Sequence, residues 1–258
     1  MTETIRSADG TMIAFDTYGD GPPLVLVGGA FQHRAIDQRT AELAQRLGER
    51  FTVFHYDRRG RGDSTDTQPW AVAREVEDLV ALVEHAGGEA LAYGMSSGGG
   101  LVIEAAGRGA ALTRLAIYEP PVSTGGDEDA ELAAELAAIV AEGRDDDAVL
   151  RFMSGFGLDE AALEGFRQTP LWTAFVGVAP TLAYDTAMMA DQGLLGERAP
   201  RIAVPLLVID GGDSPPWARE CAEAVAAAVP GARRHTIPGE THEVSTDALA
   251  PVLTEWFS

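Results

Sequence analysis

The sequence predicts an α/β protein with a mostly parallel eight-stranded sheet flanked by helices. Three observations support this class. Short apolar runs alternate with longer amphipathic segments along most of the chain, which is the pattern of strands joined by crossover helices. The run at residues 24–27 is continuously apolar, as in a strand buried on both faces. The 258 residues, 46% of them apolar, are enough for one such domain with a large core.

The first two strands are expected to pair differently from the rest. Residues 3–7 and 11–18 flank Asp9-Gly10, a dipeptide typical of a hairpin turn. This arrangement predicts two antiparallel strands at one edge of the sheet.

The remaining elements alternate along the chain. Residues 71–86, for example, place Val72, Val76, Leu79 and Val83 on one face of a helix. The other predicted helices are residues 37–49, 97–108, 216–229 and 247–257, and the predicted strands are residues 24–27, 51–56, 90–94, 115–118, 204–210 and 233–237.

Residues 122–198 depart from this alternation. Their first half is acidic and favours helix, and no strand pattern interrupts them. The stretch is short for an independent core, so we expect a small helical insertion in a core domain formed by residues 1–121 and 199–258. Its second half carries large apolar groups that could line a substrate pocket or simply pack the insertion onto the core: Phe152, Phe156, Phe166, Trp172, Phe175 and the methionines.

Charge and composition restrict the partners. The formal net charge is −21, and a field of that sign repels phosphate backbones and anionic lipid, so neither nucleic acid nor membrane is an expected partner. Cys221 is the single cysteine, which excludes an intrachain disulfide. The N-terminus lacks the apolar segment of a signal peptide, and no apolar run approaches the roughly 18 residues needed to span a bilayer. We therefore expect a cytoplasmic protein.

The strongest chemical signal is Gly94-Met95-Ser96-Ser97-Gly98. It follows an apolar strand and opens a helix, which is the context that the nucleophile-elbow pattern G-x-S-x-G requires. A sharp turn there crowds the backbone, so that only glycine fits at the first and last positions. The Ser96 hydroxyl would then stand above a helix N-terminus, where developing negative charge is favoured.

A serine hydroxyl needs a base within reach. His242 lies in a loop after the last predicted strand and is the expected base. His55, His85 and His235 fall inside a strand or helix, where packed or surface roles are expected. His33 follows the loop at Gly28-Gly29 and suits substrate contact better.

The imidazole needs a carboxylate that fixes its tautomer. Asp213, just past the strand at 204–210, is the preferred candidate, because it gives the chain order Ser, Asp, His. Asp210, at the end of that strand, and Glu119, which follows the strand at 115–118, remain alternatives.

Two backbone N–H groups should hold the oxyanion. Ser97 is expected to supply one. The loop after the strand at 24–27 should supply the other, from Ala30 or, as the alternative, from Phe31, since Gly28 and Gly29 allow close approach of the backbone.

Together these residues resemble the α/β-hydrolase superfamily over essentially the whole chain. Residues 56–64, Tyr-Asp-Arg-Arg-Gly-Arg-Gly-Asp-Ser, are similar to the D-x-R-G-x-G-x-S turn of that family, which supports the sheet and is not catalytic. The resemblance implies an α/β-hydrolase fold in which residues 122–198 form a cap over the site. Two positions depart from the family pattern. Gly28 stands where a histidine is usual. The loop of the acid usually reads glycine-x-x-aspartate, whereas here it reads Asp210-Gly211-Gly212-Asp213.

The implied activity is that of a serine hydrolase acting on an ester, lactone or thioester of a small, apolar substrate, without cofactor or metal. Phe31, His33, Trp172 and Tyr184 are the expected substrate contacts. Carbon–carbon bond hydrolysis, cofactor-free perhydrolysis and a biosynthetic cyclase or lyase reaction use the same triad and stay open. A ligand-binding member of the fold without turnover is the alternative from another class.

Overall fold

The computed structural model describes residues 2–123, 128–155 and 160–258. It confirms the predicted eight-stranded, mostly parallel sheet, in the order β1-β2-β4-β3-β5-β6-β7-β8. The strands are β1 (Glu3–Arg6), β2 (Met12–Tyr18), β3 (Pro23–Val27), β4 (Thr52–Tyr56), β5 (Ala90–Met95), β6 (Leu112–Tyr118), β7 (Leu206–Gly211) and β8 (Arg233–Ile237).

Strands β1 and β2 form the predicted antiparallel hairpin at the sheet edge, with Ile5 opposite Ile13. Gly10 in the connecting turn has a φ of 94°, a left-handed conformation that glycine adopts without steric cost. Strand β2 also runs antiparallel to β4, and every later pair in the sheet is parallel.

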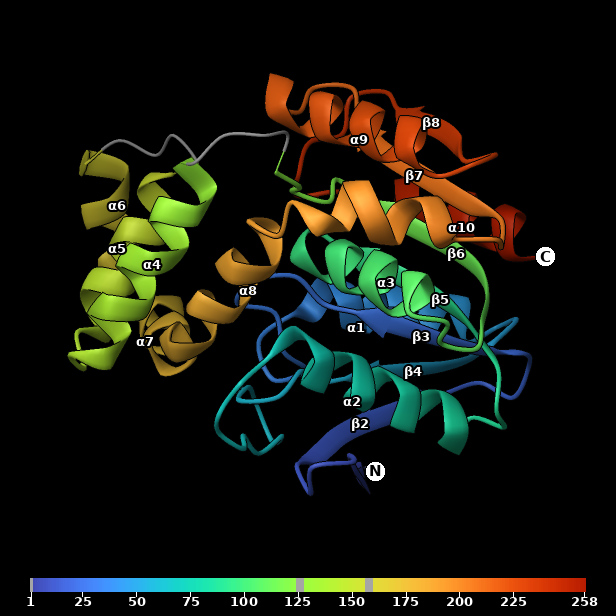
Figure 1. The fold of residues 1–258 in the computed structure, drawn as a ribbon, viewed down its shortest axis with the longest axis horizontal. Coiled ribbons are helices and arrows are strands. Elements are labelled where there is room, and N and C mark those ends of the chain that lie inside the picture. The colour runs from blue at the N-terminus through green and yellow to red at the C-terminus, as the bar shows by residue number, and fades with distance from the viewer. Residues whose placement is uncertain (1, 124–127, 156–159) are drawn as a thin grey trace.

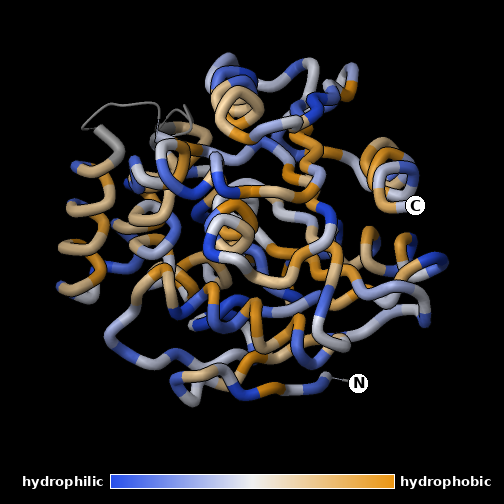
Figure 2. Tube along the Cα trace, turned by 45° about the vertical axis from the view of Figure 1, so that its right-hand side comes forward, coloured by the Kyte–Doolittle hydropathy of each residue, from blue (hydrophilic) through white to orange (hydrophobic). Residues whose placement is uncertain are grey.

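Helices cover both faces of the sheet (Figure 1). Helices α2 (Val72–His85), α3 (Ser97–Gly107) and α9 (Pro216–Ala228) lie on one face, and α1 (Gln38–Leu47) and α10 (Thr246–Phe257) lie on the other. Hydrophobic and hydrophilic positions alternate along the outer helices in Figure 2, as expected for helices with one buried face. None of the helices within the described residues is long and apolar enough to cross a membrane.

Each face has its own hydrophobic core. Leu79 of α2, Leu101 of α3 and Val225 of α9 belong to one cluster, and Leu47 of α1 and Leu253 of α10 belong to the other. All five are fully buried. The sheet between the two clusters is therefore held from both sides, which gives the loops at its carboxyl edge a rigid base.

The described residues between β6 and β7 form helices joined by turns and coil, without a strand, and we call residues 128–201 the helical insert. Phe156 of the predicted apolar set lies outside the described residues. Phe152 and Trp172 belong to a third hydrophobic cluster made mostly of insert residues. That the insert acts as a cap stays a prediction. It comprises α4 (Glu128–Ala141), α5 (Asp145–Ser154), α6 (Glu160–Arg167), α7 (Pro170–Gly177), α8 (Leu182–Met189) and the short turns Ala179–Thr181, Leu194–Arg198 and Ala199–Arg201.

Candidate active site

Ser96 sits on a sharp turn between β5 and α3. Its φ of 52° and ψ of −127° lie outside the regions that non-glycine residues normally occupy. Strain of this kind costs on the order of 1–3 kcal/mol and persists only where the surroundings enforce it. The Ser96 N–H donates to the carbonyl oxygen of Tyr118 at 2.9 Å, which ties the turn to the end of the neighbouring strand β6.

The glycines around Ser96 are required by close backbone contacts. A Cβ on Gly94 would lie 2.5 Å from the carbonyl oxygen of Gly98, and a Cβ on Gly98 would lie 2.3 Å from that of Val27. Neither contact is compatible with a side chain, as the sequence pattern predicted. The turn therefore has the backbone of a nucleophile elbow.

His242 is paired with a carboxylate, and that carboxylate is Glu119. Glu119 Oε2 lies 2.7 Å from His242 Nδ1. Glu119 Oε1 accepts a hydrogen bond from the Gly211 N–H at 2.8 Å, so both carboxylate oxygens are held. Glu119 has a φ of 42° and directly follows β6, whose last residue, Tyr118, is the register partner of Met95 on β5. Ser96 and Glu119 thus leave adjacent parallel strands at the same edge of the sheet.

The structure pairs His242 with the predicted alternative Glu119 and not with the preferred candidate, Asp213. Its side chain is exposed, and its backbone N–H donates to the carbonyl oxygen of Glu240 at 2.9 Å. The residue therefore supports the histidine loop through its backbone while its carboxylate faces outward. The alternative Asp210 is buried, but it accepts hydrogen bonds from Arg234 at 3.2 Å and Thr236 at 3.0 Å.

The loop that carries His242 is tied down on both sides of the imidazole. The Tyr118 hydroxyl donates to the carbonyl oxygen of Thr241 at 2.6 Å. The carboxylate of Glu240 accepts from the N–H and the hydroxyl of Ser245 at 2.8 and 2.7 Å. The histidine ring lies 5.4 Å from the ring of Trp217. These contacts fix the ring that Glu119 orients.

Glu119 is held in its ionised form. Full burial of the residue acts to raise its pKa, but the hydrogen bonds from His242 and the Gly211 N–H outweigh this, so that the pKa of Glu119 lies below its usual value. A buried, ionised carboxylate at Nδ1 leaves the other ring nitrogen, Nε2, free to accept a proton.

The loop after β3 lies directly against the elbow. A Cβ on Gly29 would lie 2.9 Å from Ser96 Cβ. The Gly29 N–H is already used, since it donates to Gln32 Oε1 at 2.5 Å. No acceptor among the described residues bonds to the N–H groups of Ala30 and Phe31. Both groups therefore stay available to an oxyanion, which leaves the predicted donor Ala30 and its alternative Phe31 in place.

Comparison with known proteins identifies the family of the chain. The model of the alpha/beta hydrolase family matches residues 24–253, which include the elbow, Glu119 and His242. The chain belongs to the alpha/beta hydrolase family. No curated protein matches it at a significant level.

Solved structures of other hydrolases share the fold. An alpha/beta hydrolase from Sphaerobacter thermophilus DSM 20745 is 46% identical, covering 99% of this chain and 100% of its own, with a TM-score of 0.88. A thermophilic esterase from Thermogutta terrifontis is 25% identical over 100% and 98% of the two chains, with a TM-score of 0.76. The enol-lactonase from Burkholderia xenovorans LB400 is 22% identical over 99% of each chain, with a TM-score of 0.72, a likeness of fold alone.

Two predicted substrate contacts of this hydrolase are Phe31 and His33. Both belong to the loop after β3 that begins at Gly28 and Gly29, which we call the glycine loop. The ring of Phe31 stacks on Phe175 of the insert at 4.1 Å and meets Phe152 edge-on at 5.4 Å. His33 is buried and its Nδ1 has no hydrogen-bond partner among the described residues. Burial lowers the pKa of His33, although Asp57 opposes the shift. Phe31 thus joins the loop to the insert, and its contact with substrate stays a prediction.

The other two predicted contacts take part in packing within the hydrolase. The Trp172 indole N–H donates to Asp146 at 2.7 Å inside the insert. Tyr184 stacks on Trp70 at 4.6 Å, and its hydroxyl donates to Asp66 at 2.7 Å. These contacts explain both side chains without a ligand, so their role in substrate binding also stays a prediction.

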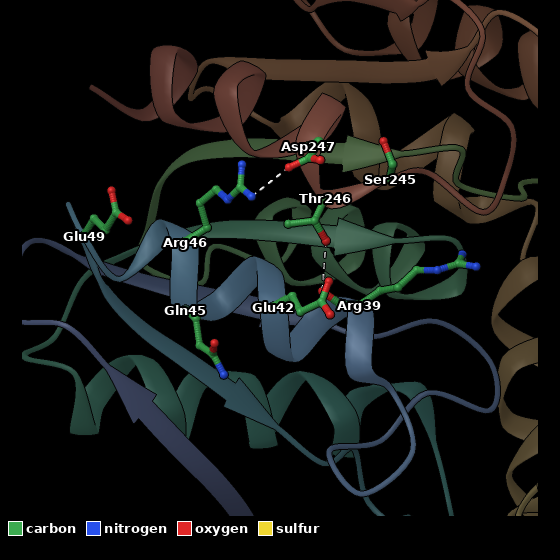
Figure 3. Close-up of a pocket in the computed structure, with 8 residues that line it drawn as sticks. All are labelled: Arg39, Glu42, Gln45, Arg46, Glu49, Ser245, Thr246 and Asp247. Atoms are coloured by element: carbon green, nitrogen blue, oxygen red, sulfur yellow. Dashed lines mark hydrogen bonds and ion pairs between the residues drawn. The ribbon is translucent and has the colours of Figure 1, made fainter.

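A surface groove of about 570 Å³ between α1 and α10 contains none of these residues (Figure 3). Both of its arginines are paired: Arg46 bonds to Asp247 across the groove at 2.7 Å, and Arg39 bonds to Glu243, the neighbour of His242. The groove is exposed and polar, unlike the apolar surroundings of Phe31. It lies outside the candidate active site.

Sequence reasoning missed a buried charge cluster behind the glycine loop of the hydrolase. Arg58 and Arg61 come from the turn after β4, and Asp185 comes from α8; all three are buried. One signal was present in the sequence: Asp185 lies three residues after Leu182, on the apolar side of its helix. A carboxylate at such a position requires a cationic partner.

Proposed function

We propose that this alpha/beta hydrolase cleaves carboxylic esters, including lactones and thioesters, through an acyl-enzyme on Ser96. The contact between Glu119 and His242 is the observation that carries the proposal. This contact orients an imidazole at the sheet edge where the strained Ser96 turn ends. An acyl-transfer site requires a carboxylate that orients an imidazole, and an imidazole that serves the serine hydroxyl.

In this mechanism the Nδ1–H of His242 donates a hydrogen bond to Glu119, and Nε2 acts as the general base. Nε2 removes the proton of Ser96 Oγ as the oxygen attacks the substrate carbonyl carbon. The N–H groups of Ala30 and Ser97 stabilise the oxyanion. His242 then protonates the leaving alcohol or thiol, and a water molecule activated by the same nitrogen releases the acid from Ser96.

The surroundings favour an uncharged, apolar acyl group. The aromatic rings of Phe31, Phe152 and Phe175 meet beside the loop that carries Ala30. The arginines bonded to that loop are already paired with carboxylates, Arg58 with Glu75 and Arg61 with Asp185. A net charge of −21 further disfavours anionic substrates. In this proposal the helical insert is the cap that shapes the acyl pocket. The names of two structural neighbours, an esterase and an enol-lactonase, fit this substrate class.

A fluorophosphonate probe followed by peptide mass spectrometry tests the nucleophile. We expect covalent labelling at Ser96 and its loss in Ser96→Ala, together with loss of p-nitrophenyl butyrate hydrolysis. An unlabelled wild-type chain would contradict the proposal and identify a ligand-binding member of the fold.

A matched pair of substrates tests the preferred charge. p-Nitrophenyl butyrate and the p-nitrophenyl monoester of succinic acid have acyl groups of similar length, and only the second carries a carboxylate. We expect kcat/KM at least tenfold higher for the neutral ester. Equal values, or a preference for the anionic ester, would refute the uncharged pocket while leaving the triad intact.

A further inference from the structure

Asp185 is the central acceptor of the buried charge cluster. Its Oδ1 accepts a hydrogen bond from the Ser97 hydroxyl at 2.7 Å and another from Arg58 Nη1 at 2.7 Å. Its Oδ2 accepts from Arg61 Nη2 at 2.6 Å. Asp185 is fully buried; burial acts to raise its pKa, but Arg61 and Arg58 lower it below the usual value. The residue is therefore an anion shared by three donors.

One branch of the cluster reaches the glycine loop through Arg61. Arg61 Nη1 donates to the carbonyl oxygen of Gly29 at 2.5 Å, and Nε donates to the Thr181 hydroxyl at 3.0 Å. The Gly29 carbonyl belongs to the same peptide plane as the Ala30 N–H. In a trans peptide these two groups point in opposite directions. Arg61 therefore keeps the Ala30 N–H pointing away from the cluster, and a flip of this peptide would bury the N–H against a guanidinium.

The other branch reaches the start of α3. Ser97 is the first residue of that helix, and its backbone N–H is one of those that a helix leaves without an internal partner. Its hydroxyl is held between Asp185 and Arg58 Nη1, the latter at 3.2 Å. Arg58 Nη1 also donates to the carbonyl oxygen of Gly28 at 3.3 Å. The same cluster thus holds both sides of the place where the oxyanion would bind.

We infer that Asp185, on α8 of the insert, is a positioning residue that sets both oxyanion donors, Ser97 directly and Ala30 through Arg61. The inference rests on the proposed function and adds a role for the insert within it. The N–H pair is aligned only while α8 is seated on the turn after β4. Alignment of the two oxyanion donors and seating of the insert on the core are therefore coupled, and stabilisation of the transition state depends on both.

The same turn offers a matched control. Arg59 is as buried as its neighbours and forms two hydrogen bonds of 2.7 Å with Asp78 on α2. Its other partners are Asp9 and the carbonyl oxygen of Arg74, and none of these belongs to the glycine loop or the elbow. Asp78→Asn therefore weakens a buried ion pair of the same kind without touching the oxyanion donors.

The test compares Asp185→Asn with Asp78→Asn on p-nitrophenyl butyrate. Fluorophosphonate titration counts competent sites, so that kcat is expressed per active site. For Asp185→Asn we expect kcat per site to fall 10- to 100-fold with KM changed less than threefold, because the donors act on the transition state. The rate of fluorophosphonate labelling should fall in parallel. Asp78→Asn should lose thermal stability and keep kcat per site within twofold of the wild type.

Two milder variants keep the inference falsifiable if Asp185→Asn does not fold. Ser97→Ala removes the direct branch, and Thr181→Val removes one support of Arg61. Each should lower kcat per site about 3- to 10-fold with KM nearly constant. Equal kcat per site in Asp185→Asn and the wild type, or in both milder variants and the wild type, would overturn the inference. A wild-type chain without labelling at Ser96 would instead overturn the proposed function, and this inference with it.

Discussion

Glu119 Oε2 lies 2.7 Å from His242 Nδ1, although 123 residues separate the two in the chain. The pair joins the end of β6 to the loop before α10. Glu119 is anchored by the Gly211 N–H as well, so the carboxylate also ties strand β7 to this site.

The first prediction concerns which carboxylate serves the histidine. Glu119→Gln keeps the size of the side chain but removes the charge and favours the wrong imidazole tautomer. We expect kcat for p-nitrophenyl butyrate to fall by about 10³- to 10⁴-fold. Asp213→Asn changes an exposed side chain and should leave kcat within twofold of the wild type. Steady-state kinetics of the two variants decide the matter, and the reverse pattern would restore Asp213 as the acid.

The second prediction concerns the contact between the glycine loop and the elbow. Gly29→Ala would place a methyl group 2.9 Å from Ser96 Cβ and 3.0 Å from the Met95 carbonyl oxygen. The loop must retreat, which should cost about 1–3 kcal/mol of stability and lower kcat by about 10²-fold or more because an oxyanion donor moves with it. Gly165→Ala is the control, since its Cβ meets nothing within 4 Å. Wild-type kcat in Gly29→Ala would show that this loop is not part of the site.

The third prediction concerns stability in acid. Burial acts to raise the pKa of Asp9, but hydrogen bonds from Arg59 and the Thr11 N–H lower it to about 2. A carboxyl whose folded pKa lies below its unfolded value, near 3.9, stabilises the protein above about pH 4 and loses that effect as pH falls to about 2. Asp9→Asn should therefore lower the free energy of unfolding by about 1 kcal/mol at pH 7. The difference in this free energy between the variant and the wild type should shrink between pH 4 and pH 2.5. Urea denaturation across this range measures it; a difference that is constant with pH would contradict the pKa of Asp9.

The fourth prediction follows from the charge of the whole chain. With 40 acidic residues against 19 basic ones, self-repulsion opposes the folded state, and salt screens it. Raising NaCl from 10 mM to 1 M should raise Tm by about 3–6 °C, which corresponds to about 1–2 kcal/mol for a chain of this size. Calorimetry at pH 7 measures the shift. Exposed ion pairs such as Arg46–Asp247 contribute little each, so a Tm that falls with salt would show that they outweigh the repulsion.

Most of the fold was predictable because it depends on local patterns. The Asp9-Gly10 turn, the apolar run of β3 and the apolar spacing of α2 each specify an element without reference to the rest of the chain. The elbow was predictable for the same reason, since a strand, two glycines and a helix are contiguous around Ser96. The choice of His242 as the expected base came from its loop position once a nucleophile had been assigned.

The acid and the charge cluster depend on packing between distant segments. Glu119 and Asp213 both follow strands that end at one edge of the sheet, and spacing alone does not tell which side chain turns toward the imidazole. The left-handed φ of Glu119 and the hydrogen bond from the Asp213 N–H to Glu240 decide it. Asp185 lies 88 residues from Ser97, so its role is visible only when α8 is seated on the core.

The position of Glu119 on β6 has a consequence for the order in which the site is made. Ser96 and Glu119 both precede the helical insert, whereas His242 follows β8, the strand at one edge of the sheet. A ribosome therefore synthesises Ser96 and Glu119 before the insert and His242 only after β8. In a nascent chain Glu119 therefore has no imidazole to pair with until β8 has been made, and its contact with His242 forms after the insert has been synthesised.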